Sequence, residues 1–126
     1  MTLNENEIAK LLEEDIVYIA TTKKNTNPHL VPIWFVSHNG KIYFETGLNT
    51  LTYKNIEHNN NIMLCFGGKE TYLIKGTTRK YPLSESPISM DLYREKYSDF
   101  VKDDYFGEDT YVYEVIIEQE LSWHYS

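Results

Sequence analysis

Hydrophobic and polar positions along the chain follow patterns that predict mostly strands. Six segments are rich in the β-branched and aromatic residues that favour strands. They are residues 15–22, 28–38, 41–46, 62–66, 72–80 and 110–118, and residues 121–125 are a candidate for a short seventh. In segment 110–118, apolar residues alternate along one face, as in a half-buried strand. Short turns link most neighbours, which is typical of an antiparallel barrel.

Two or three short helices are expected around these strands. Asn4 and Glu7 have the spacing of a capping box, and the apolar residues that follow them fall on one helix face. A second helix is expected over residues 48–58. A third is expected to start at Ser86-Pro87 and to carry a stripe of Tyr93, Tyr97, Phe100 and Val101.

Three positions carry specific backbone signals. Asn39-Gly40 predicts a two-residue hairpin loop, which would place Phe35 opposite Phe44 and Ile33 opposite Thr46. Pro32 cannot donate a ladder hydrogen bond, so it belongs at a sheet edge or a bulge. Gly76, in the middle of a strand, indicates a bulge or a close backbone approach.

These elements predict a mainly β protein, a six- to seven-stranded antiparallel barrel with peripheral helices. The length of 126 residues indicates one domain over residues 1–126. Aromatic residues make up 14% of the chain, and eleven of them are Tyr. Tyrosine suits half-buried sheet faces and interfaces, because its ring is apolar and its tip polar.

Charge and motifs exclude several classes of function. The net charge of −7 argues against general nucleic-acid binding. A single cysteine, Cys65, permits no internal disulfide. The N-terminus has no signal-peptide pattern and no apolar run is long enough to span a membrane, so a cytoplasmic location is expected. Nucleotide-binding glycine motifs and hydrolase signatures are absent, and the four histidines lack zinc-site spacing, so no metal is expected.

A cluster of hydroxyl and basic side chains lies around the expected second helix. Thr46 ends a strand, Thr52 lies near the helix start, and Lys54 follows two residues later. Helix N-termini, hydroxyl groups and lysines all attract phosphate. The alternative is a plainly capped helix with a solvated lysine.

The order of these segments resembles the FMN-binding split barrel of pyridoxamine-phosphate-oxidase-like proteins. The resemblance covers roughly residues 7–80 and rests on the segments VYIATT (17–22), PHLVPIWF (28–35), IYFET (42–46) and TYKNI (52–56). It implies a homodimer with FMN at the subunit interface. It also implies that Val31, Pro32 and Ile33 contact the flavin and that Thr46, Thr52 and Lys54 bind its phosphate.

Two tryptophans have alternative roles under this resemblance. Trp34 either packs beside the flavin ring or belongs to the barrel core. Trp123 either reaches the flavin of the other subunit or packs on its own barrel. The family often places an arginine near the phosphate, and the matching second strand here has none. The substrate-binding motifs of true pyridoxamine-phosphate oxidases are not evident, so that activity is not expected.

Three functions remain open from the sequence. The first is an FMN-dependent oxidoreductase acting on a small-molecule substrate. The second is a non-catalytic protein that binds a flavin, a deazaflavin or haem, with His29 and His124 as candidate haem ligands. The third is a dimeric β-barrel interaction module without a cofactor, in which the aromatic residues serve the dimer interface.

Overall fold

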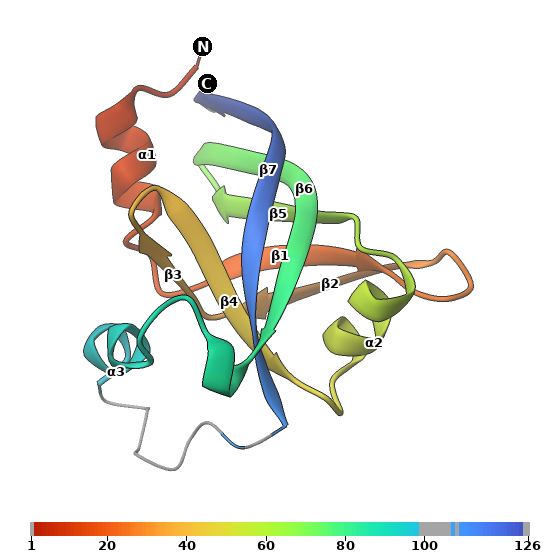
Figure 1. Ribbon diagram of the computed structural model, residues 1–126. Coiled ribbons are helices and arrows are strands. Elements are labelled where there is room, and N and C mark those ends of the chain that lie inside the picture. Colours follow the sequence, from red (N-terminus) through yellow and green to blue (C-terminus); the bar gives the residue numbers. More distant parts are fainter. Residues whose placement is uncertain (1, 99–106, 108, 125–126) are drawn as a thin grey trace.

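A computed structural model describes residues 2–98, 107 and 109–124 and contains one sheet of seven antiparallel strands. The sheet curls on itself, with the strand order β2-β1-β5-β6-β7-β4-β3 (Figure 1). The expectation of a mainly β split barrel is confirmed. The strands are β1 (Val17–Thr22), β2 (Pro28–Ile33), β3 (Phe35–His38), β4 (Lys41–Gly47), β5 (Ile62–Gly67), β6 (Glu70–Pro82) and β7 (Thr110–His124). The helices are α1 (Glu5–Leu11), α2 (Leu51–His58) and α3 (Asp91–Lys96), with a 3-10 turn η1 (Leu83–Glu85).

The chain changes its pairing partner at Trp34. The sequence predicts one strand over residues 28–38, but β2 pairs with β1 and β3 pairs with β4. Ile33 therefore lies opposite Val17, and its predicted pairing with Thr46 is wrong. Because β2 and β3 are the two end strands of the sheet and are joined by one residue, the sheet has to curl until its ends meet. Residues 110–118 and 121–125 were expected as separate strands, but their described part is one strand, β7.

The predicted hairpin and bulge are both present. Asn39 and Gly40 have positive φ angles of 51° and 78°, as a type I′ turn requires. Phe35 lies opposite Phe44, as expected. The β6–β7 register shifts at Gly76, where an added Cβ would lie 2.1 Å from the Ile116 carbonyl oxygen.

The main core lies inside the curled sheet. Phe35, Phe44, Phe66 and Tyr113 are fully buried in it. Two helices add to this core, α1 with Leu11 and α2 with Ile56. The capping box that starts α1 is confirmed.

A second apolar cluster lies on the other face of β4. Successive strand residues point to opposite faces, so Phe44 enters the main core and Tyr43 enters the second cluster with Tyr93 and Tyr97. The predicted third helix begins at Asp91 rather than at Ser86, and its predicted residues Phe100 and Val101 lie outside the described residues. No helix in the described ranges is long and apolar enough to cross a membrane.

Candidate functional site

The strand β2 presents the predicted flavin-contacting residues at the end of the sheet. Its partner is β1, and Pro32 lies opposite Tyr18. Val31 and Ile33 pack against the main core, whereas Pro32 is exposed. The edge of β2 that faces away from β1 pairs with no described strand, as expected for an edge proline. Its backbone groups are therefore open to a ligand.

Trp34 lies at the junction of β2 and β3 and packs in the second cluster. Its ring stacks on Tyr97 at a centroid distance of 4.3 Å and an interplanar angle of 6°. It is therefore not part of the main core inside the barrel. The stacking leaves Trp34 beside Val31, Pro32 and Ile33 in the chain, at the edge where a flavin ring is expected.

The last residue of α3, Lys96, and its C-cap residue, Tyr97, hold this junction in place. The Tyr97 hydroxyl accepts the Phe35 backbone N–H at 3.0 Å and lies 2.7 Å from the Asp15 carbonyl oxygen. Lys96 donates to the Phe35 carbonyl oxygen at 2.9 Å. Burial lowers the pKa of Lys96 to about 8. The backbone groups freed by the change of partner strand are thus satisfied by α3.

The hydroxyl groups at the start of α2 bond to one another. Thr50 is the N-cap residue, and its side-chain oxygen accepts the Tyr53 N–H. The Thr50 hydroxyl donates to the Gly47 carbonyl at 2.9 Å. Thr46 lies 2.6 Å from the Thr50 oxygen and must be the donor there, because the Thr50 proton is already used.

The other predicted phosphate ligands lie on two different sides of α2. Thr52 is buried on the inner side, next to Asn55, whose amide donates to Thr21 at 3.0 Å. Lys54 is exposed. The pocket that contains Lys54, described next, is lined by neither Thr46 nor Thr52.

Lys54 instead shares a pocket with lysines from the β1–β2 turn. We call this the lysine pocket; it has a volume of about 490 Å³ and is lined by Lys23, Lys24, Asn25, Leu51, Lys54, Asn55 and His58. The α2 residues among them are spaced three and four apart, so they form one helix face. Three lysine residues line this pocket although the chain has a net charge of −7. Lys23 and Lys24 lie between the first two segments expected as strands, and only the fold brings them to Lys54.

Glu45 is a second residue that the sequence analysis missed. It precedes Thr46 in β4 and faces the side opposite to Phe44. Burial raises the pKa of its carboxyl group to about 7. No hydrogen bond or ion pair to this carboxyl group is formed by the residues that the structure describes. A partly buried carboxyl that titrates near neutral pH is a common feature of reactive sites.

Trp123 lies far from these groups within one chain. Thr110, at the start of β7, lies opposite Gly47 near α2, whereas Trp123 lies near the other end, opposite Thr71. Its side chain is 37% exposed. A contact between Trp123 and a ligand near β2 would have to come from a second subunit.

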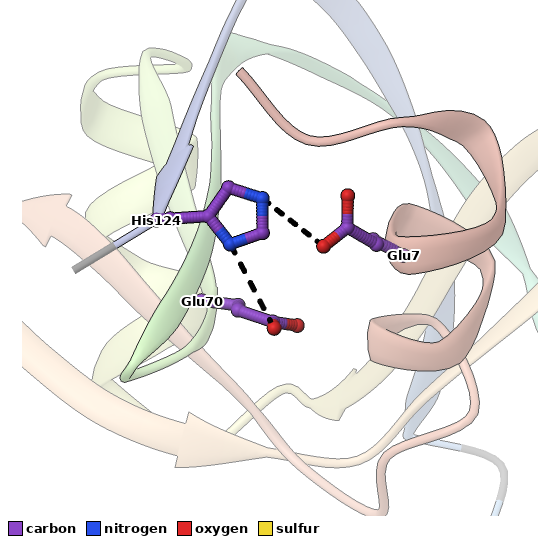
Figure 2. A group of neighbouring side chains, drawn as sticks. All are labelled: Glu7, Glu70 and His124. Carbon is purple, nitrogen blue, oxygen red and sulfur yellow. Dashed lines mark ion pairs between the residues drawn. The ribbon is translucent and has the colours of Figure 1, made fainter. Parts of the chain in front are cut away.

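His124, a candidate haem ligand, is held between two carboxylates. Figure 2 shows Glu7 of α1 and Glu70 of β6 on either side of the His124 ring. The Nε2 atom lies 3.1 Å from Glu7 and the Nδ1 atom 3.8 Å from Glu70. The three side chains are of metal-ligand type, but the two carboxylates lie at different nitrogens of the imidazole ring. The group therefore ties α1 to the ends of β6 and β7.

Solved structures with this fold come from several kinds of protein. A conserved hypothetical protein from Mycobacterium tuberculosis has 18% identity and a TM-score of 0.81, with 99% of this chain and 87% of that chain covered. An F420 reductase has 17% identity and a TM-score of 0.73, with 89% and 94% covered. The haem storage protein HutZ from Vibrio cholerae has 14% identity and a TM-score of 0.75, with 98% and 95% covered. These likenesses show the fold alone.

Comparison with curated proteins finds no significant match. The model of the family described as pyridoxamine 5'-phosphate oxidase matches residues 5–124, which is nearly the whole chain. The match includes the open edge of β2, the start of α2 and the whole of β7. The chain therefore belongs to the pyridoxamine 5'-phosphate oxidase-like family of split-barrel proteins.

Proposed function

We propose that this protein binds FMN as a homodimer and acts as a cytoplasmic oxidoreductase on a small-molecule substrate. Bound FMN would supply the hydride or electron transfer, and the protein would bind and orient the ring. The observation that carries the proposal is the lysine pocket. Oxidation of pyridoxamine phosphate is not proposed, because the substrate-binding motifs of that activity are not evident in the sequence.

The lysine pocket fits a phosphate group. Lys23, Lys24 and Lys54 supply three cations in an otherwise acidic chain. A phosphate monoester carries between one and two negative charges at neutral pH. Charge-assisted hydrogen bonds from ammonium groups are about twice as strong as neutral ones. This pocket supplies the charge that the missing arginine of the second strand would otherwise provide.

The open edge of β2 fits the ring of a flavin. The ring has donors and acceptors along one side, and the free backbone groups around Val31, Pro32 and Ile33 can pair with them. Trp34 and Tyr97 add a stacked aromatic surface next to this edge. Glu45, with its raised pKa of about 7, is a nearby group that can take up or release a proton at neutral pH.

An apolar band on the outside of the sheet fits a dimer interface. Pro32, Tyr18, Cys65, Leu73 and Leu121 lie side by side on five adjacent strands, in that order. Tyr18 is 42% exposed and Leu121 is 48% exposed. Trp123 lies two residues beyond Leu121 on the same face of β7. Contiguous exposed apolar surface of this kind marks an interaction site, and a second copy would bring a Trp123 towards the partner's β2.

Titration with FMN and with riboflavin tests the phosphate site. Lys54→Ala and Lys23→Ala should each weaken FMN binding about five- to tenfold, because each removes one charge-assisted contact. Both variants should bind riboflavin, which lacks the phosphate, as the unaltered protein does. Lys10→Ala, in the exposed last turn of α1, is the matched control and should change neither affinity. Flavin fluorescence and the visible spectrum are the measurements.

Other outcomes of the same experiment discriminate the alternatives. Binding of haem or of the deazaflavin F420 without FMN would keep the fold and overturn the cofactor proposal. If none of the three binds, the interaction module becomes the better description. If FMN binds, oxidation of a reduced nicotinamide by the loaded protein separates an enzyme from a binding protein.

A further inference from the structure

A second, polar cavity lies on another side of α2. It has a volume of about 240 Å³, is open to solvent on one side, and is lined by residues of α2, of the segment that follows it, and of β6 and β7. We call it the Tyr113 cavity; it is lined by Ile56, Glu57, Asn60, Thr78, Lys80 and Tyr113. The helix residues Ile56 and Glu57 face this cavity, whereas Leu51, Lys54, Asn55 and His58 face the lysine pocket. The two sites are therefore separate.

The hydroxyl group of Tyr113 is buried without a partner in this cavity. The side chain has 0% exposure, and the hydroxyl forms no hydrogen bond within the described part of the chain. Glu57 and Tyr53 of α2 and Tyr111 of β7 act electrostatically on this hydroxyl. Burial raises the pKa of Tyr113, which keeps the hydroxyl protonated and able to donate. A buried polar group left unpaired costs about 1–3 kcal/mol, and native proteins rarely retain one without a water or ligand.

Two groups of opposite charge, Lys80 and Glu57, line the cavity beside this hydroxyl, and each keeps some free hydrogen-bonding capacity. Lys80 lies opposite Tyr113 in the sheet and donates to Glu57 at 2.7 Å. An ammonium group has three donors and a carboxylate has two oxygens, so both retain capacity after pairing. Asn60 and Thr78 bond mainly to each other. The cavity therefore offers donors from Tyr113 and Lys80 and an acceptor from Glu57, with no net charge.

We propose that the Tyr113 cavity binds a small neutral molecule through a primary carboxamide group. The amide oxygen can accept from the Tyr113 hydroxyl and from Lys80, and the amide N–H can donate to Glu57. An alcohol would have to accept from Tyr113 and Lys80 and donate to Glu57 through one oxygen atom. An anion would have to displace Glu57 from its ion pair with Lys80. The cavity is also several times larger than the roughly 30 Å³ that one water occupies in the liquid. This site does not depend on flavin binding.

Titration with benzamide, followed by amide NMR spectra of the full chain, tests the site. Benzamide should shift the signals of Asn60, Thr78 and Lys80, and benzoate, which has the same shape and a negative charge, should not. Tyr113→Phe should weaken benzamide binding about three- to tenfold, the effect of one hydrogen bond. Tyr111→Phe is the matched control, because Tyr111 lies on the same strand but does not line the cavity, and it should bind benzamide normally.

Three results would overturn the proposal. Benzamide shifts confined to the lysine pocket would place the ligand elsewhere. Equal binding of benzamide and benzoate would contradict the neutral site. Equal benzamide binding by a folded Tyr113→Phe variant would show that the hydroxyl is not a ligand contact. The shifts in the unaltered protein locate the site even if Tyr113→Phe does not fold.

Discussion

At the scale of single residues, Glu45 makes the stability of this protein depend on pH. Its carboxyl group has a pKa of about 7 in the fold, against 4.5 as the ordinary value, because burial disfavours the charged form. The folded chain therefore binds more protons than the unfolded chain between about pH 4.5 and pH 7. By linkage, the contribution of Glu45 to the free energy of unfolding falls as the pH rises through this range.

The variant Glu45→Gln should remove this dependence. It should match the unaltered protein near pH 4.5 and be more stable by about 2–3 kcal/mol at pH 8, since glutamine stays neutral. Urea denaturation at a series of pH values measures the difference. Glu118→Gln, on the exposed part of β7, is the control. Its difference in stability from the unaltered protein should not grow with pH. If the free energies of unfolding of Glu45→Gln and of the unaltered protein differed by the same amount at every pH, the buried carboxyl group would not be the cause of the pH dependence.

At the scale of elements, the bulge at Gly76 depends on the absence of a side chain. A Cβ atom there would lie 2.1 Å from the Ile116 carbonyl oxygen, which belongs to the backbone and cannot turn aside. Gly76→Ala should therefore lower the free energy of unfolding by about 1–3 kcal/mol through overpacking. Gly68→Ala has open space around the added Cβ and should change stability much less. Equal midpoints in thermal denaturation would refute the requirement for glycine at the bulge.

Local signals predicted the elements well, and long-range pairing was the harder part. Asn39-Gly40 and Gly76 act through their own backbone, so a single sequence is enough to predict the hairpin and the bulge. The change of partner at Trp34 depends on which strands lie at the two ends of the sheet, and nothing near Trp34 encodes that. The same reason explains the site: Lys54 was predicted from its helix, but Lys23 and Lys24 join it only through the folded β1–β2 turn.

At the scale of the whole molecule, the apolar band predicts that the protein is a dimer in solution. Leu121→Glu places a charge at the β7 end of the band and should shift the protein from dimer to monomer, because burying an unpaired carboxylate at an interface is costly. Leu48→Glu is the matched control, because Leu48 is 44% exposed against 48% for Leu121 but lies outside the band. Analytical ultracentrifugation distinguishes the two states. A monomeric unaltered protein would remove the basis for Trp123 reaching a partner's flavin.

The junction at Trp34 also has a consequence for how the chain folds. The β3–β4 and β5–β6 hairpins are local and can form early, whereas β4 meets β7 only after a long stretch of chain has been ordered. Such non-local pairing slows folding relative to a helical protein of the same size. However, β2 and β3 are consecutive, so docking β2 on β1 also brings the β3–β4 hairpin close to its final position. The single residue between the two ends of the sheet thereby shortens the conformational search, and β7 completes the barrel by entering between β6 and β4.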